Sequence, residues 1–367
     1  MNGSLPRSAF VALAALLPLG LSRGAHAEPP QMREHEASAA VRTESDDGRV
    51  SLSIGGFLQA RAAFTRGTGP DAEEADPLVS LTRARLYTFG HVHDPSLRYR
   101  LMLGTNGAET TFQLFDAYVE KTFAPELRIR FGRTKIPVFR SWVESARMFA
   151  GVERDAATVA LLPGREVLVM VRGELGHETL EYAVAAFDAG ERHETTAIPA
   201  AAARLVWNPM GHALEGEVDF DDTPFAVSLG ASALTGRKPT VAWEGSERTV
   251  DETLAGAEVL LRAHGFDLGG EVERRDRRTA DGARWLVRGA YARADYYVPS
   301  LQSAFGVRTS MIRSSDPTLR DRDEFELDGG FYPGRHDVKL VGEVATARVG
   351  GSGTRELRAA LQLQVAF

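Results

Sequence analysis

The sequence lacks cysteine altogether, so its 367 residues cannot form a small secreted domain held together by disulfides. After residue 27 it also lacks any run of the roughly 18–20 apolar residues that a membrane-spanning helix needs. We therefore expect no helical membrane protein. Lysine occurs at only four positions, and the net charge is −7, which argues against a nucleic-acid-binding protein.

Enzyme motifs are missing as well. The chain contains no H-E-x-x-H, G-x-S-x-G, P-loop or dinucleotide glycine pattern, so we expect no catalytic residues and no cofactor. His91 and His93 share one face of an expected strand, but a third metal ligand is not in view. Asp219, Asp221 and Asp222 could bind calcium, although a solvated acidic turn explains them better. No metal site is predicted.

The N-terminal residues have the pattern of a secretory signal peptide. Arg7 precedes an apolar run over residues 9–21, and Ala25-His26-Ala27 forms a small-x-small cleavage site. We expect residues 1–27 to be removed. Residues 28–49 are polar and contain prolines, which predicts a flexible periplasmic lead. Residues 50–367 are taken as one domain.

From Val50 onward, apolar and polar residues alternate with period two, the period of a β-strand. Connections alternate between short turns with strong breakers, such as His93-Asp94-Pro95, and longer links. The longer links are expected over residues 65–77, 134–164, 188–200, 236–251, 314–322 and 348–354. One short and one long connection per strand pair is typical of outer-membrane barrels. The sequence therefore predicts an all-β, transmembrane, antiparallel up-and-down β-barrel of about 16 strands.

Arginines occupy the polar face of the first expected strands. Facing lipid, each would cost about 2–4 kcal/mol near the bilayer midplane, and six of them would match or exceed a domain's stability of about 5–15 kcal/mol. We therefore expect them to line a pore. The predicted pore-lining residues are Arg61, Arg83, Arg85, Arg98, Arg100, Arg128 and Arg130. In the alternative fold, a soluble β-sandwich, the same face would merely be solvated.

The last residues alternate as strictly as any in the chain. Leu357, Leu361, Leu363, Val365 and Phe367 share one face, and polar residues lie between them. We expect this strand to close the barrel against the first one, so that no edge is left unpaired in lipid. We also expect its terminal Phe367 to be presented to the barrel-insertion machinery.

Several segments resemble the phosphate-selective porin O and P family. The likeness runs through most of the chain after the signal peptide. It is carried by Thr82-Arg83-Ala84-Arg85-Leu86, by Phe115-Asp116-Ala117-Tyr118-Val119, by Gly329-Gly330-Phe331-Tyr332-Pro333, and best by Leu127-Arg128-Ile129-Arg130-Phe131-Gly132-Arg133-Thr134-Lys135-Ile136-Pro137. The resemblance implies a sixteen-stranded, usually trimeric barrel whose third external loop folds inward.

The segment over residues 134–164 occupies the place of that loop. By the resemblance, Lys135, Arg140, Arg147 and Arg154 are constriction residues. Family members that select phosphate also carry lysine clusters at the channel entrances. This chain departs from them, since its only lysines are Lys121, Lys135, Lys238 and Lys339.

The function expected from these features is that of an outer-membrane porin for small, mainly anionic solutes, with phosphate or polyphosphate among them. The expected partners are small anions, outer-membrane lipids and two further copies of the chain in a homotrimer. Two alternatives stay open: a barrel enzyme of the lipase or esterase type, and a soluble secreted β-sandwich binding module. The inner arginines could also pair across the lumen with Asp116, Glu120, Glu271 or Glu273 and only organise water.

Overall fold

The computed structural model describes residues 39–69, 74–106, 111–189, 199–211, 214–243, 246–350 and 353–367. The expected signal peptide and residues 28–38 of the expected lead lie outside these residues. Within the rest of the lead, Ala39–Glu44 form strand β1. β1 pairs with Ser51–Gly55 at the start of β2, through a turn in which Ser45 N donates to Val50 O at 2.9 Å.

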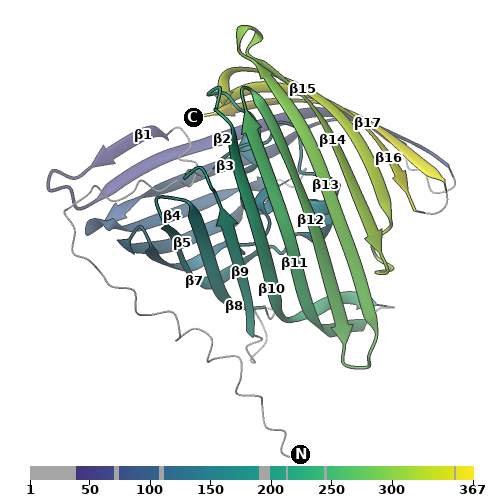
Figure 1. Ribbon diagram of the computed structural model, residues 1–367, viewed down its shortest axis with the longest axis horizontal. Coiled ribbons are helices and arrows are strands. Elements are labelled where there is room, and N and C mark those ends of the chain that lie inside the picture. The colour runs from purple at the N-terminus through teal and green to yellow at the C-terminus, as the bar shows by residue number, and fades with distance from the viewer. Residues whose placement is uncertain are drawn as a thin grey trace, which may run out of the picture.

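Sixteen further strands form one closed antiparallel barrel (Figure 1), which confirms the predicted fold class and strand number and excludes the sandwich. The strands are β2 Ser51–Thr68, β3 Glu74–Val92, β4 Asp94–Asn106, β5 Gln113–Ala124, β6 Leu127–Lys135, β7 Arg165–Leu175, β8 Leu180–Asp188, β9 Pro199–Trp207, β10 Ala226–Trp243, β11 Ser246–Ala263, β12 Phe266–Thr279, β13 Arg284–Val298, β14 Ser303–Ser314, β15 Arg322–His336, β16 Val338–Val349 and β17 Thr354–Ala366.

The barrel closes between its last and first strands. β17 pairs with β2 from Arg355 opposite Thr68 to Ala366 opposite Phe57. The backbone of Phe367 continues the ladder, since its N–H donates to Gly56 O at 2.9 Å and its carbonyl accepts from Gly56 N at 2.8 Å. Each of these sixteen strands thus has two neighbours, the arrangement that satisfies backbone groups in lipid.

Side chains alternate between the two faces of the wall as the period of two predicts. On β17, Leu361 is 50 % exposed and Leu363 is 48 % exposed, whereas Gln362 and Gln364 are 1 % and 0 % exposed. The outer face is thus apolar and the lumen face polar. Among the described helices, none is long and apolar enough to cross a membrane.

Three connections differ from the sequence-based expectation. The link expected over residues 65–77 is shorter than predicted, because β2 runs to Thr68 and β3 begins at Glu74. The expected long link over residues 236–251 is wrong, because β10 and β11 stay paired from Ala226 opposite Arg262 to Trp243 opposite Ser246. The expected short turn after Asn208 is wrong as well, since the β9–β10 connection runs to Phe225. The alternation of apolar and polar residues could not reveal the error at residues 236–251. Gly236 and Pro239 are typical turn residues, but here they lie in a long hairpin.

The β6–β7 connection contains three short helical elements. They are α1 Arg140–Val143, the 3₁₀ turn η1 Ala146–Met148 and α2 Ala156–Leu161. A second 3₁₀ turn, η2 Pro299–Leu301, joins β13 to β14.

The lipid-facing assignment predicts a penalty for charge on the outer wall. Leu361→Arg should lower the free energy of unfolding in phospholipid vesicles by about 2–4 kcal/mol, because arginine would face hydrocarbon near the middle of a strand. Leu361→Ala is the control and should cost less. Urea titration measures both. An arginine variant as stable as the alanine variant would contradict a membrane-embedded wall.

Candidate pore and constriction

The β6–β7 connection, residues 136–164, is fastened to inward-facing side chains of the opposite half of the barrel. Phe139 N donates to Ser232 Oγ on β10 at 3.2 Å, and Ser141 N donates to Glu271 Oε1 on β12 at 2.7 Å. We call this connection the constriction segment. These two anchors hold it against the later strands of the barrel.

Apolar packing fixes the same position. Ile136, Val138 and Leu161 are fully buried and pack in one cluster with inward-facing residues of β7–β14. Two glycines of the wall make room for this packing. A Cβ on Gly256 would lie 2.5 Å from the Phe139 ring, and a Cβ on Gly289 would lie 2.6 Å from Leu161 Cδ1.

Glu153 ties the tip of the constriction segment to the first strands. Its carboxylate lies 3.1 Å from Arg61 Nη2 and also forms an ion pair with Arg83. Burial alone would raise the pKa of Glu153, but Arg83 and Arg61 outweigh it and hold the pKa at about 2. The carboxylate is therefore ionised at neutral pH.

The β9–β10 connection also enters the lumen, which the sequence did not predict. Glu217 N donates to Met148 O at 3.1 Å, and Ala150 N donates to Glu217 Oε2 at 2.8 Å. Phe220 meets Tyr297 edge-on, with ring centroids 4.9 Å apart. The two connections thus meet and fill one side of the lumen.

Asp219 of the same connection has a structural role. Its carboxylate accepts from Thr223 N at 3.0 Å and from Gly265 N at 2.9 Å. Burial opposes ionisation, but these hydrogen bonds lower the pKa. Asp221 pairs with Arg335 at 2.6 Å. The expected solvated turn is therefore wrong for Asp219, which is buried, and fits Asp221, whose ion pair is exposed.

The open side of the lumen is a cavity of about 810 Å³ between the constriction segment and the wall of β2–β9. Its lining contains twelve arginines and one lysine against six carboxylates, a formal excess of seven positive charges. The basic residues are Arg61, Arg83, Arg85, Arg100, Arg128, Arg130, Lys135, Arg140, Arg147, Arg154, Arg165, Arg172 and Arg204. The acidic residues are Asp116, Glu144, Glu153, Glu174, Glu181 and Glu215.

Ten of the eleven residues predicted from the sequence lie in this lining. Arg98 does not, because it lies near the turn end of the barrel, where its Nε donates to Pro95 O at the start of β4 at 3.2 Å. The sequence analysis missed Arg165, Arg172 and Arg204. Arg172 on β7 and Arg204 on β9 alternate with apolar residues. The same two-residue alternation that predicted Arg128 as lumen-facing could therefore have predicted these two.

Part of the basic wall is neutralised locally. Glu120 accepts from Arg130 at 2.8 Å and from Arg172 at 2.9 Å, and Asp116 accepts from Arg165 at 3.0 Å. These pairs join the neighbouring strands β5, β6 and β7, so these two carboxylates are neutralised within one wall and not across the lumen. In contrast, Glu271 binds Ser141, and Glu273 accepts from Thr158 Oγ1 at 3.2 Å.

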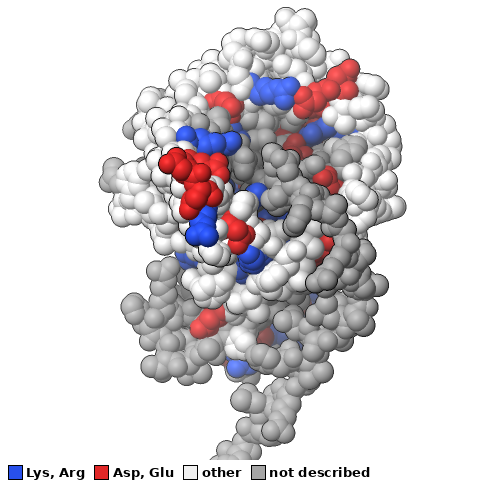
Figure 2. Space-filling model, turned by 90° about the vertical axis from the view of Figure 1, so that its left-hand side faces the viewer, with Lys and Arg blue, Asp and Glu red and all other residues white. Residues whose placement is uncertain are grey.

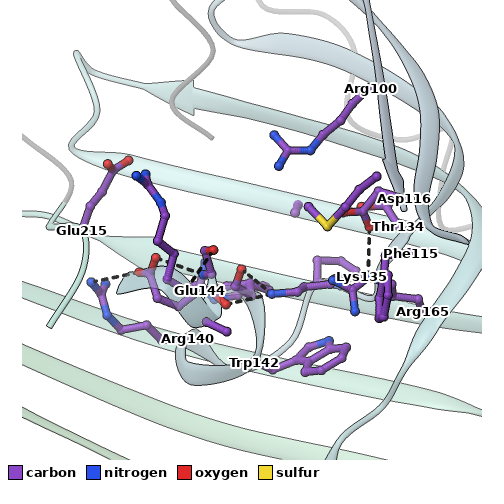
Figure 3. Close-up of a pocket in the computed structure, with 18 of the residues that line it drawn as sticks. Arg100, Phe115, Asp116, Thr134, Lys135, Arg140, Trp142, Glu144, Arg165 and Glu215 are labelled. Atoms are coloured by element: carbon purple, nitrogen blue, oxygen red, sulfur yellow. Dashed lines mark hydrogen bonds and ion pairs between the residues drawn. The ribbon is translucent and has the colours of Figure 1, made fainter. Parts of the chain in front are cut away.

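Two cations of the constriction bind neutral carbonyl groups instead. Lys135 Nζ donates to Val143 O at 3.1 Å and to Glu144 O at 2.8 Å, as Figure 3 shows. Arg154 donates to Ser141 O at 2.8 Å and to Glu144 O at 2.9 Å. Burial lowers the pKa of Arg154 to about 10, which leaves it charged at neutral pH.

Charge is distributed differently on the later strands. There, Asp267 binds Arg262 and Arg293, and Glu326 accepts from Arg308 at 2.7 Å. Arg358 lies near Glu343 at 2.6 Å. Basic and acidic side chains also alternate on the face that bears β1 (Figure 2). The excess of positive charge therefore belongs to the lining of the cavity beside the early strands.

The two histidines of the sequence analysis do not form a metal site together. His93 has a φ of 70° and lies in the turn between β3 and β4, so the expected shared strand face is wrong. The His91 ring contacts Ser51 Oγ at 2.7 Å and Gly48 O at 3.0 Å. This serine–histidine pair ties the β1–β2 turn to β3 and lies outside the cavity lining. The described residues contain no group of three metal-ligating side chains.

Comparison with solved structures identifies the fold. The outer membrane channel DcaP of Acinetobacter baumannii is 13 % identical with a TM-score of 0.61, over 89 % of this chain and 99 % of its own. An anion-selective porin from Comamonas acidovorans is 13 % identical with a TM-score of 0.59, over 87 % and 100 %. OmpT of Vibrio cholerae, in its trimer form, is 11 % identical with a TM-score of 0.59, over 87 % and 100 %.

No protein-family model matches the chain, and no curated protein matches it. The structural matches define the class as a barrel with the fold of outer-membrane porins. The resemblance to the phosphate-selective family stays a prediction.

The ion pairs of Glu153 predict a pH-dependent contribution to stability. The folded pKa of about 2 lies below the ordinary 4.5, so the contribution is full above pH 4.5 and is lost as pH falls toward 2. Glu153→Gln should therefore lower the free energy of unfolding at pH 7 by up to about 3 kcal/mol. The difference from the wild type should vanish near pH 2. Urea titrations at several pH values measure it, and a difference independent of pH would contradict the assignment.

Proposed function

We propose that the chain is an outer-membrane porin through which small anions diffuse passively. The observation that carries this proposal is the excess of seven positive charges in the lining of the cavity. Partly buried charges are screened by salt much less than exposed ones, so the potentials of these side chains add. A lumen of this kind concentrates anions and rejects cations.

The chemistry of the lining supports passage as well as attraction. Arginine stays charged at any relevant pH, and its planar fork suits both carboxylate and phosphate oxygens. Conduction requires several weak sites and no single tight one. The arginines of β2–β9 and the constriction segment offer such a series, and partial neutralisation by Glu120 and Asp116 keeps the individual sites weak.

Phosphate is one solute that we propose for this series. Arginine-rich lining suits its oxygens, and the resemblance of the Arg128–Pro137 stretch supports the same idea. The scarcity of lysine places this chain apart from family members with lysine-rich entrances. We therefore take small anions in general as the solute class and phosphate as a member of it.

Location and assembly belong to the same proposal. The apolar outer wall supports contact with outer-membrane lipids, and the N-terminal pattern supports export with cleavage near Ala27. The trimer form of OmpT from Vibrio cholerae supports a homotrimer. We further propose that β17, which ends beside Phe367, is the strand recognised during barrel insertion. The chain is proposed to act as a channel and not as an enzyme.

Removing charge from the basic wall should reduce anion preference. In planar bilayers under a KCl gradient, the double variant Arg128→Ser/Arg130→Ser should lower the chloride-to-potassium permeability ratio by about twofold or more. It removes two positive charges from the lining, leaves Glu174 without Arg128, and leaves Glu120 still paired with Arg172. The control Arg237→Ser/Arg313→Ser removes two arginines outside the cavity lining and should leave the ratio unchanged. Equal ratios in all three proteins would contradict the proposed role of the wall.

A further inference from the structure

The cavity holds a cluster in which cations and aromatic rings alternate. The Arg85 guanidinium lies 3.8 Å from the centre of the Phe115 ring, and Arg165 lies 5.1 Å from the same ring. Arg165 also lies 5.5 Å from the Trp142 ring, and Lys135 Nζ lies 5.2 Å from it. These residues come from four strands and from α1, and Figure 3 shows several of them around one space.

Hydrogen-bond donors remain available in this cluster. Trp142 is 6 % exposed, and its Nε1–H has no hydrogen-bond partner among the described residues, although the residue lines the cavity. A buried donor without an acceptor destabilises the folded protein, and a bound acceptor would remove that penalty. Lys135 Nζ uses two of its three donors on carbonyl groups. The Trp142 donor is covered in the unliganded cavity, so an acceptor that bonds to both groups must displace the side chains over Nε1.

Apolar surface lies next to these donors. Trp142 and Met170 belong to the buried cluster beneath the constriction segment, and Val143 and Leu162 pack against that cluster. All four also line the cavity. A bare inorganic anion has no group that would cover this surface. A solute with an anionic head and a flat apolar body would cover it and would also satisfy the donors.

We propose that the cavity contains a binding site for small aromatic carboxylates, in which the carboxylate accepts from Trp142 Nε1 and Lys135 Nζ. The ring of the solute packs on Val143 and Leu162, while Arg85 and Arg165 supply the surrounding positive potential. The inference deepens the proposed function and rests on it, since it names one solute class for the same pore.

The test is calorimetric titration of the detergent-solubilised wild type with benzoate, and the matched probes are acetate, benzyl alcohol and inorganic phosphate. Acetate keeps the charge without the ring, and benzyl alcohol keeps the ring without the charge. We expect benzoate to bind at least about tenfold more tightly than any of the three, because only benzoate uses both the donors and the apolar surface.

Two variants locate the site. Trp142→Phe keeps the ring but removes the donor, and Lys135→Met removes the ammonium; each should weaken benzoate binding about tenfold. The controls are Trp207→Phe, on the outer face of β9, and Lys121→Met, which removes a lysine that binds Asp94 outside the cavity. Both should bind benzoate like the wild type. Resistance to urea confirms that each variant is folded.

Binding and conduction are measured separately, so the two proposals can fail independently. A wild type that conducts chloride selectively but binds benzoate no better than acetate overturns this inference and leaves the porin. Equal benzoate affinity in the wild type, Trp142→Phe and Lys135→Met also overturns it. A protein that binds benzoate at these residues but passes no current overturns the porin and leaves the site.

Discussion

The exclusion of charge from lipid determines the architecture of this protein. Each strand arginine would cost about 2–4 kcal/mol on the outer face, so the strands must turn that face inward together. Once Arg83 and Arg85 face the lumen, the alternation of a strand places Ala84 and Leu86 in lipid. The same constraint requires closure, which the pairing of β17 with β2 provides. The polar lining of the lumen and the apolar outer surface therefore both follow from the two-residue alternation of side chains along each strand.

A closed barrel of sixteen strands leaves a wide lumen, and its two inward connections decide which part of that lumen stays open. The constriction segment rests on the later strands through Ser232 and Glu271, and Glu217 of the β9–β10 connection joins it there. The remaining space lies along the early strands, where the arginines gather. The charge of the open space thus depends on which wall the constriction segment covers as well as on the composition of the wall.

Local pattern was enough to predict the number of strands, the alternation of their side chains and the closing strand. It was not enough for the β9–β10 connection, because Asn208-Pro209-Met210-Gly211 reads as a tight turn whether or not the next residues enter the barrel. The partners of Glu217 and Phe220 are far away in sequence. Likewise, the cluster of Trp142 with Phe115 and Arg165 depends on tertiary packing across three elements. Arg98 shows the remaining limit. Alternation along a strand predicts which face of the wall a side chain occupies, but not how far along the barrel axis it lies.

The absence of cysteine allows a direct test of where the passage runs. Val159 and Ala157 are two residues apart in α2; Val159 lines the cavity and is 48 % exposed, whereas Ala157 is fully buried against the wall. A negatively charged, thiol-reactive sulfonate should block current through Val159→Cys and leave Ala157→Cys unaffected. Block of Ala157→Cys with an unaffected Val159→Cys would place the passage on the other side of the constriction segment and contradict the account.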